Sequence, residues 1–259
     1  MLSTPTSQGP TSPPASRLRR RPAPGAPRAE RATPMTTHSG DGRADATRRQ
    51  ILRAASHQFA RRPYHEVGLD DILAEAQLTK GAMYFHFKSK HALAVELIDK
   101  QIAAATVAVG DLLTRGLSGL ETLIDFSYLI AVQDIKTDSV RAGLNLVESV
   151  GKPAGLQDTL LGGWVEALSG VVGQAIAQGD IDEGCDPADV GRLMVSLHMG
   201  LRKTSNLDDP ERFLLDLEKS WLIILGGILQ ADRTEYFRQF LRRRAALAVN
   251  ASSTDEDSP

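Results

Sequence analysis

Hydrophobic residues recur every three or four positions through most of the chain, which places them on one face of successive helices. Glycine, proline and aspartate residues interrupt this pattern between the helices. The helices that it predicts span residues 45–62, 69–77, 80–86, 89–115, 120–133, 138–150, 156–178, 186–205, 208–228 and 234–249. Since no run of alternating β-branched residues demands a strand, the sequence predicts an all-α fold.

Two of these helices are short and lie close together in the sequence, between residues 68 and 90. The apolar face of the first consists of Leu69, Ile72, Leu73 and Ala76. Leu78 fills the turn, and Thr79 can cap the second helix because its hydroxyl accepts a backbone N–H. Such a pair occurs in many all-α proteins, and it is also the form of a DNA-binding helix-turn-helix.

The second short helix carries residues suited to a nucleic-acid surface. Gly81 and Ala82 at its start allow close approach of the backbone, and a helix N-terminus offers N–H groups and partial positive charge to phosphate. Lys80 adds a formal charge, while Tyr84 and His86 add hydrogen-bond donors. We therefore interpret this helix as one that enters the major groove of DNA.

Residues 79–90 read Thr-Lys-Gly-Ala-Met-Tyr-Phe-His-Phe-Lys-Ser-Lys, which resembles the recognition-helix signature of TetR-type transcriptional repressors. The match extends from Thr47 to about Lys100 and implies a DNA-binding domain at residues 44–90. In this family Thr or Ser usually starts the first short helix and contacts phosphate, and here the backbone N–H of Gly68 could take that role. The other implied phosphate contacts are Thr47, Arg48, Thr79, His86 and Lys90. Those facing the groove and backbone are Lys80, Gly81, Ala82 and Tyr84.

Trp164 is the lead candidate for an effector pocket in the remaining helices, residues 91–249. Gly162 and Gly163 leave space beside its ring for a small flat ligand, although the pattern alone favours a ring that simply fills core. Residues 141–146, Trp164 and residues 178–181 resemble the body of the γ-butyrolactone receptor subgroup, and this resemblance implies that Trp164 covers the ligand.

Further pocket candidates follow from helix position only, and they are Tyr128, Gln133, Leu144 and Val147. The subgroup often has Pro-Tyr before the tryptophan, whereas this chain has Leu160 and Leu161. This chain therefore lacks the tyrosine hydroxyl of the subgroup, and two classes of effector remain open. One is a γ-butyrolactone, butenolide or furan-like autoregulator, and the other is an antibiotic or other lipophilic compound.

Composition and charge add to this picture. Residues 1–100 contain 16 Lys or Arg and 9 Asp or Glu, a balance of +7, and the rest contain 14 and 23, a balance of −9. This asymmetry suits a chain that presents one end to nucleic acid.

Residues 1–43 hold 8 of the 13 prolines and a basic cluster at residues 17–21, so we expect a disordered tail. It could be a DNA-binding arm, a solvated tail, or a segment upstream of initiation at Met35. Residues 250–259 form a polar tail.

The sequence offers no metal-ligand spacing and no phosphate-cradling glycine loop, so we expect neither an enzyme nor a cofactor. A single cysteine is typical of the reducing cytoplasm, and no apolar run approaches the ~20 residues of a membrane span. The resemblance implies a homodimer on a pseudo-palindromic double-stranded operator. The alternative is a non-specific nucleoid-type DNA binder. The expected dimer surface on helices 186–205 and 210–229 comprises Leu193, Met194, Leu197, Leu201, Phe213, Leu217, Trp221, Ile224 and Leu225.

Overall fold

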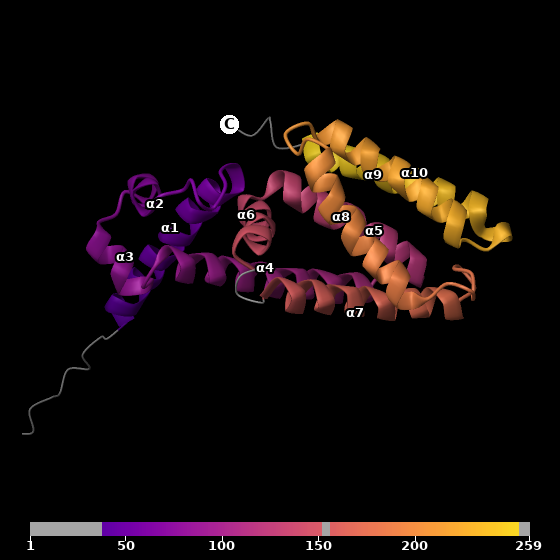
Figure 1. Cartoon of the computed structure of the whole chain (residues 1–259), viewed down its shortest axis with the longest axis horizontal. Coiled ribbons are helices and arrows are strands. Elements are labelled where there is room, and N and C mark those ends of the chain that lie inside the picture. Colours follow the sequence, from indigo (N-terminus) through magenta and orange to yellow (C-terminus); the bar gives the residue numbers. More distant parts are fainter. Residues whose placement is uncertain (1–37, 152–155, 254–259) are drawn as a thin grey trace, which may run out of the picture. The chain divides into compact units, whose positions relative to one another are not determined.

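The computed structural model describes residues 38–151 and 156–253, and helices account for most of them (Figure 1). The α-helices are α1 (His38–Arg61), α2 (Leu69–Ala76), α3 (Lys80–His86), α4 (Lys90–Leu113), α5 (Gly119–Lys136), α6 (Asp138–Leu146), α7 (Leu156–Ala177), α8 (Pro187–Thr204), α9 (Pro210–Ile228) and α10 (Thr234–Ser253). A π-helical turn, η1 (Val147–Gly151), follows α6, and a 3-10 turn, η2 (Ala231–Arg233), precedes α10.

The predicted all-α fold is confirmed, and most helix boundaries agree within a few residues. Within the described part of the chain, the only β interaction is an isolated bridge between Ile181 and Leu229. Three boundaries differ. Helix α1 begins at His38 instead of residue 45, inside the segment 1–43 expected to be disordered, and α6 ends at Leu146, where the wider π turn replaces it. Helix α10 continues to Ser253, into the polar tail predicted at residues 250–259. The other residues of the two predicted tails, 1–37 and 254–259, lie outside the described residues.

One hydrophobic core holds α1, α2 and α3 against the first half of α4, and we call these elements the head. Its fully buried members include Ile51, Phe59, Ile72, Met83 and Leu93. Two residues of α6, Ala142 and Leu146, pack into the same cluster. The core of the head is therefore completed by a helix that lies far away in the sequence.

A second core holds α5, α7, α8, α9 and α10 together, and we call this part the body. Its largest fully buried side chains are Trp221, Phe213 and Phe237. This packing corrects the predicted dimer surface on α8 and α9. Six of its nine residues are buried inside the chain, namely Met194, Leu201, Phe213, Leu217, Trp221 and Leu225.

Helix α7 is more apolar than the sequence reading expected. Its segment Leu160–Ala177 is long and apolar enough to cross a membrane by length and composition alone, with 17% of that window buried. The same helix packs against α5 and α8, and its Val172 and Ala175 are buried in the body's core. These contacts bury one face of α7, and the rest of the helix is half-buried or exposed.

The start of α5 lies so close to α7 that only glycine fits there. A Cβ atom added to Gly119 would lie 2.5 Å from the backbone N of Ala175 and 2.7 Å from the carbonyl O of Val171. We expect Gly119→Ala to lower the free energy of unfolding by about 1–3 kcal/mol, because the backbones must separate. Denaturant unfolding measures this change.

Gly110 in α4 is the matched control, since nothing lies within 4 Å of a Cβ atom added there. Alanine has the higher helix propensity, so Gly110→Ala should raise the free energy of unfolding by about 0.5–1 kcal/mol. Equal effects of the two substitutions would show that the α5–α7 approach is not as close as described.

Candidate functional site

Helix α3 is fixed by two buried residues that leave its opposite face exposed. Met83 and Phe87 lie four positions apart, hence on one side of the helix, and both point into the head's core. Phe85 lies on the opposite side and is 78% exposed, and Lys80 and Tyr84 are also exposed, the tyrosine to 54%. Of the other predicted contacts on α3, Gly81 is exposed, and Ala82 and His86 are half-buried. An outward face with a cation and two aromatic rings is chemically suited to DNA grooves and phosphates.

Caps fix both short helices. The Thr79 hydroxyl accepts the Ala82 N–H at 3.3 Å, as predicted. At the start of α2 the Gly68 N–H donates to the Asp71 carboxylate at 2.8 Å. This bond corrects the expectation for Gly68, because the N–H that was to contact phosphate is already occupied within the chain.

The two acidic residues of α2 are compensated by basic neighbours. The Lys80 ammonium lies 2.9 Å from an Asp70 carboxylate oxygen, and this hydrogen bond raises the pKa of Lys80. Arg62 lies 3.1 Å from Asp71, and the Gly68 and Arg62 bonds lower the pKa of Asp71. Both Lys80 and Asp70 are exposed, so the lysine can exchange this carboxylate for a phosphate at small cost.

Three predicted phosphate ligands already have partners in the head. The Lys90 ammonium donates to the carbonyls of Tyr64 and Val67, both at 2.8 Å, and burial lowers its pKa. Arg48 pairs with Glu96 at 2.7 Å, and the Thr47 hydroxyl donates to the Arg43 carbonyl. Their phosphate contacts stay predictions, and the structure gives each residue a role in positioning α1, α3 and α4.

Two residues important to this surface were missed by the sequence reading. Phe85 is the most exposed large side chain of α3, and the phase set by Met83 and Phe87 could have revealed it. Gln50 on α1 donates to the Ala76 carbonyl at 2.6 Å and so holds the end of α2. No sequence signal marks that bond, because it joins residues 26 positions apart.

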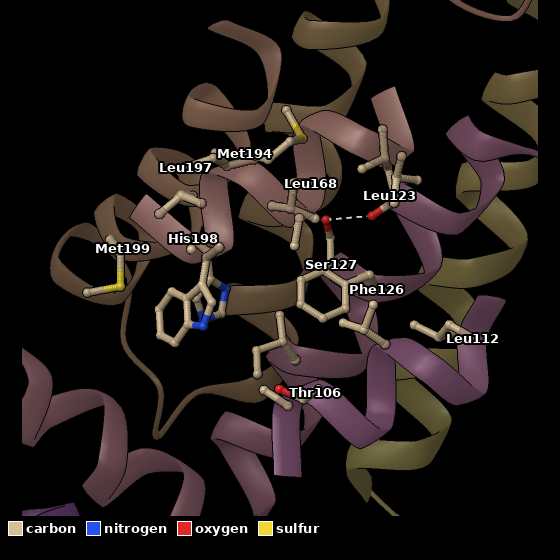
Figure 2. Close-up of a pocket in the computed structure, with 18 of the residues that line it drawn as sticks. Thr106, Leu112, Leu123, Phe126, Ser127, Leu168, Met194, Leu197, His198 and Met199 are labelled. Atoms are coloured by element: carbon tan, nitrogen blue, oxygen red, sulfur yellow. Dashed lines mark hydrogen bonds between the residues drawn. The ribbon is translucent and has the colours of Figure 1, made fainter. Parts of the chain in front are cut away.

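The body contains an apolar cavity of about 430 Å³. Helices α4 to α9 all contribute to its wall, and Figure 2 shows Phe126, Leu168 and His198 from three of them around it. Its apolar lining includes Leu112, Leu123, Phe126, Leu144, Trp164, Leu168 and Met194. A concave, mainly hydrophobic site of this size is typical of small-molecule binding.

Two of the five predicted pocket residues, Trp164 and Leu144, line this cavity. The other three are corrected. Tyr128 lies on the opposite side of α5 from the lining residues Phe126 and Ile130, and its ring is buried in the body's core. Gln133 lies beyond Ile130 toward the end of α5, and Val147 packs into the head's core.

Few polar groups of the cavity wall are available to a ligand. The hydroxyls of Thr106, Thr122 and Ser127 donate to carbonyls of their own helices, at 2.8–2.9 Å. The side chains of Gln101, Trp164 and His198 form no hydrogen bond to another residue in the described ranges. These three groups could therefore orient a neutral ligand.

The half-buried His198 lies where the cavity meets a charged pair of the body, and its Nε2 atom is buried. Its Nε2 lies 3.8 Å from a carboxylate oxygen of Asp134, which also pairs with Arg202. Burial lowers the pKa of His198 to about 4, the Asp134 charge opposes this shift, and Arg202 adds to it. The imidazole is therefore neutral near pH 7.

Fold and site together define an all-α protein with a helix-turn-helix head and a helical body that encloses an apolar cavity. Residues 51–97 match the family model described as bacterial regulatory proteins, tetR family. The head thus carries the DNA-binding domain of this family, and the chain as a whole resembles γ-butyrolactone receptors.

The resemblance extends beyond the head. The A-factor receptor protein of Streptomyces griseus is 28% identical over 193 residues, which cover 72% of this chain and 65% of that protein. A γ-butyrolactone receptor (ArpA-like protein) of known structure is 28% identical, with a TM-score of 0.69 over 79% of this chain and 99% of that one. CprB of Streptomyces coelicolor, solved in complex with its operator, is 29% identical, with a TM-score of 0.69 over 80% and 99%.

The lowered pKa of His198 predicts how stability depends on pH. The unfolded chain binds a proton here below about pH 6.5, whereas the folded chain does so only near pH 4. The free energy of unfolding should therefore fall as the pH drops through this window, by about 1–2 kcal/mol between about pH 7 and pH 5. Denaturant unfolding at both pH values measures it, and His198→Phe should remove that part of the decrease.

His91→Phe, on the exposed side of α4, is the control and should leave the pH dependence unchanged. The titratable or charged groups facing His198 are Asp134 and Arg202, which remain in both variants. If His198→Phe keeps the full decrease, the imidazole is not buried as described.

Proposed function

We propose that this protein is a homodimeric, cytoplasmic transcriptional repressor. It binds a pseudo-palindromic operator through α3 and is released when a small lipophilic signal, a γ-butyrolactone, butenolide or furan-like autoregulator, enters the cavity of the body. Its targets would be genes of secondary metabolism. The observation that carries the proposal is the pairing of an outward cationic and aromatic face on α3 with an apolar cavity beside Trp164.

The exposed side of α3 supports DNA reading. Lys80 and Tyr84 lie one turn apart on that face and can reach phosphate or base edges, while Phe85 offers an apolar surface of the kind that contacts thymine methyl groups. One seven-residue helix reads only a few base pairs, so specific binding needs two copies. A two-fold dimer supplies them and accounts for the pseudo-palindrome.

The proposed dimer contact lies on outward apolar residues of α8, α9 and α10. Ile223 on α9 is 78% exposed, and the other exposed apolar residues of these helices include Leu193, Leu215 and Leu247. Leu193 was already predicted from the sequence, whereas Leu215, Ile223 and Leu247 replace the predicted residues that are buried.

Two alternatives remain distinguishable. Leu160 lines the cavity with an apolar side chain, which favours a lipophilic ligand with few hydrogen-bonding groups and keeps an antibiotic or other lipophilic compound as a candidate. A non-specific nucleoid-type DNA binder would use the basic charge of the head alone. Excess unrelated DNA would abolish its binding, whereas a sequence-specific repressor retains its operator.

Lys80→Ala should weaken operator binding about tenfold or more, because a base or phosphate contact contributes about 1–3 kcal/mol. Gel shift with the DNA upstream of the protein's own gene, in the presence of unrelated competitor DNA, measures the change. Lys136→Ala on α5 is the matched control, since that lysine is exposed on a helix of the body outside the proposed dimer contact. Equal affinity of the two variants would refute the placement of Lys80 against DNA.

Trp164→Ala should retain operator binding and lose release by the ligand. The probe is γ-decalactone, a γ-butyrolactone with a hexyl chain, with binding measured by calorimetry and release by gel shift. Truncation removes about 3 kcal/mol or more of apolar contact and should raise the dissociation constant by about a hundredfold. Tyr128→Phe is the aromatic control outside the cavity and should respond like the unaltered protein.

The outcomes separate the ligand classes. Release of the unaltered protein by the lactone supports the autoregulator class. Release by an organic extract of the host culture but not by the lactone, still dependent on Trp164, supports another lipophilic signal. If the Trp164→Ala variant is released from the operator as readily as the unaltered protein, the effector binds elsewhere.

A further inference from the structure

A chain of polar contacts runs from the cavity wall to the last turn of α1. It begins at His198, whose Nε2 lies 3.8 Å from the Asp134 carboxylate. Asp134 pairs with Arg202, and a second guanidinium N–H of Arg202 donates to the Asn145 side-chain oxygen at 2.6 Å. The Asn145 amide then donates to the carbonyls of Phe59 and Ala60, at 3.0 and 3.3 Å.

The orientation of the Asn145 amide is fixed by its partners. Arginine can only donate hydrogen bonds, so the amide oxygen must face Arg202, and carbonyls can only accept, so the amide nitrogen must face α1. Because the amide is planar, a shift of Arg202 turns its N–H groups away from α1. The contact between α6 and the head thus depends on a residue of the body.

The cluster has room for a second arrangement. Asp134 Oδ1, His198 Nε2 and Arg202 Nε are buried and have no hydrogen-bond partner among the residues that the structure describes. Buried polar groups without partners are unfavourable, so a rearrangement that satisfies one of them costs little. A ligand that presses on the imidazole from the cavity can close the 3.8 Å gap to Asp134. The Asp134 carboxylate then binds both His198 and Arg202, and the hydrogen bond from Arg202 to Asn145 changes.

We propose that His198, Asp134, Arg202 and Asn145 transmit occupancy of the cavity to the end of α1, with Asn145 as the positioning residue for the head. This inference rests on the proposed function for the presence of an effector, and it adds the route by which that effector acts. A second contact between α1 and α6 lies outside the cluster, the exposed ion pair of Arg61 with Asp138 at 2.8 Å. It supplies a control for any loss of contact between the same two helices.

The first test perturbs the cavity end of the cluster without a ligand. Amide hydrogen exchange of residues 56–62 in the full chain reports how firmly the last turn of α1 is held. We expect His198→Phe to change this exchange by about fivefold, the effect of one hydrogen bond made or lost. Val195→Ala alters the same cavity wall on the same helix without touching Asp134, and should leave residues 56–62 unchanged.

The second test uses γ-decalactone and follows the same amides. The lactone should change their exchange by about fivefold in the unaltered protein and in Arg61→Ala. In Asn145→Leu this response should disappear, although calorimetry still detects binding. A purely structural Asn145 would raise the basal exchange and leave the response to ligand intact.

The two tests separate the inference from the proposed function. If calorimetry detects no lactone binding, the ligand class proposed above is wrong, and the His198→Phe comparison alone decides the route. If His198→Phe leaves residues 56–62 unchanged, or if Asn145→Leu keeps the ligand response, the cluster does not transmit occupancy and the inference is overturned.

Discussion

The buried ion pair of Asp134 and Arg202 sets the arrangement of the helices around the cavity. A carboxylate removed from water is strongly unfavourable unless a partner compensates it, and Asp134 is completely buried. Helices α5 and α8 must therefore meet where these two residues pair. His198 lies one turn before Arg202 on α8 and brings the same charged pair to the cavity wall. The same ion pair thus compensates a charge buried in the fold and lies beside the cavity in which a ligand could bind.

Helix α6 connects this pair to the head. Its Ala142 and Leu146 pack into the core of the head, while Leu144, on a different face, lines the cavity. Gly143 lies against α4, since a Cβ atom added there would be 2.6 Å from Cβ of Gln101, itself a cavity residue. A helix held this closely on two sides cannot deform gradually. It responds to a change in the cavity by a small rigid shift, as packed helices generally do.

The sequence predicted the helices well because their periodicity, caps and breaks are local properties. The exposed side of α3 is also a local property, because the spacing of Met83 and Phe87 determines which side is buried, and Phe85 could have been predicted from it. The three wrong pocket residues share a different cause. Tyr128, Gln133 and Val147 were chosen by nearness along the chain, whereas the cavity wall depends on how far each helix is rotated and extended by its packing. The cluster around Asp134 joins residues 57 to 86 positions apart, from the Arg202–Asn145 bond to the Asn145–Phe59 bond, and no local pattern marks such pairs.

The head itself is built to move as one unit. Lys90 ties the start of α4 to the carbonyls of Tyr64 and Val67, and Arg48 ties α1 to Glu96 on α4. With Met83 and Phe87 buried, α3 has no freedom to rotate on its own. An effector therefore cannot act by reshaping the reading helix, and it has to alter where the whole head is placed. In a two-fold dimer a small rotation at α1 and α4 changes the separation of two such heads, and that separation must match the spacing of the operator half-sites. In the proposed mechanism, the rigidity of the head converts a shift of a few contacts at Asn145 into a mismatch between the two reading helices and the operator half-sites.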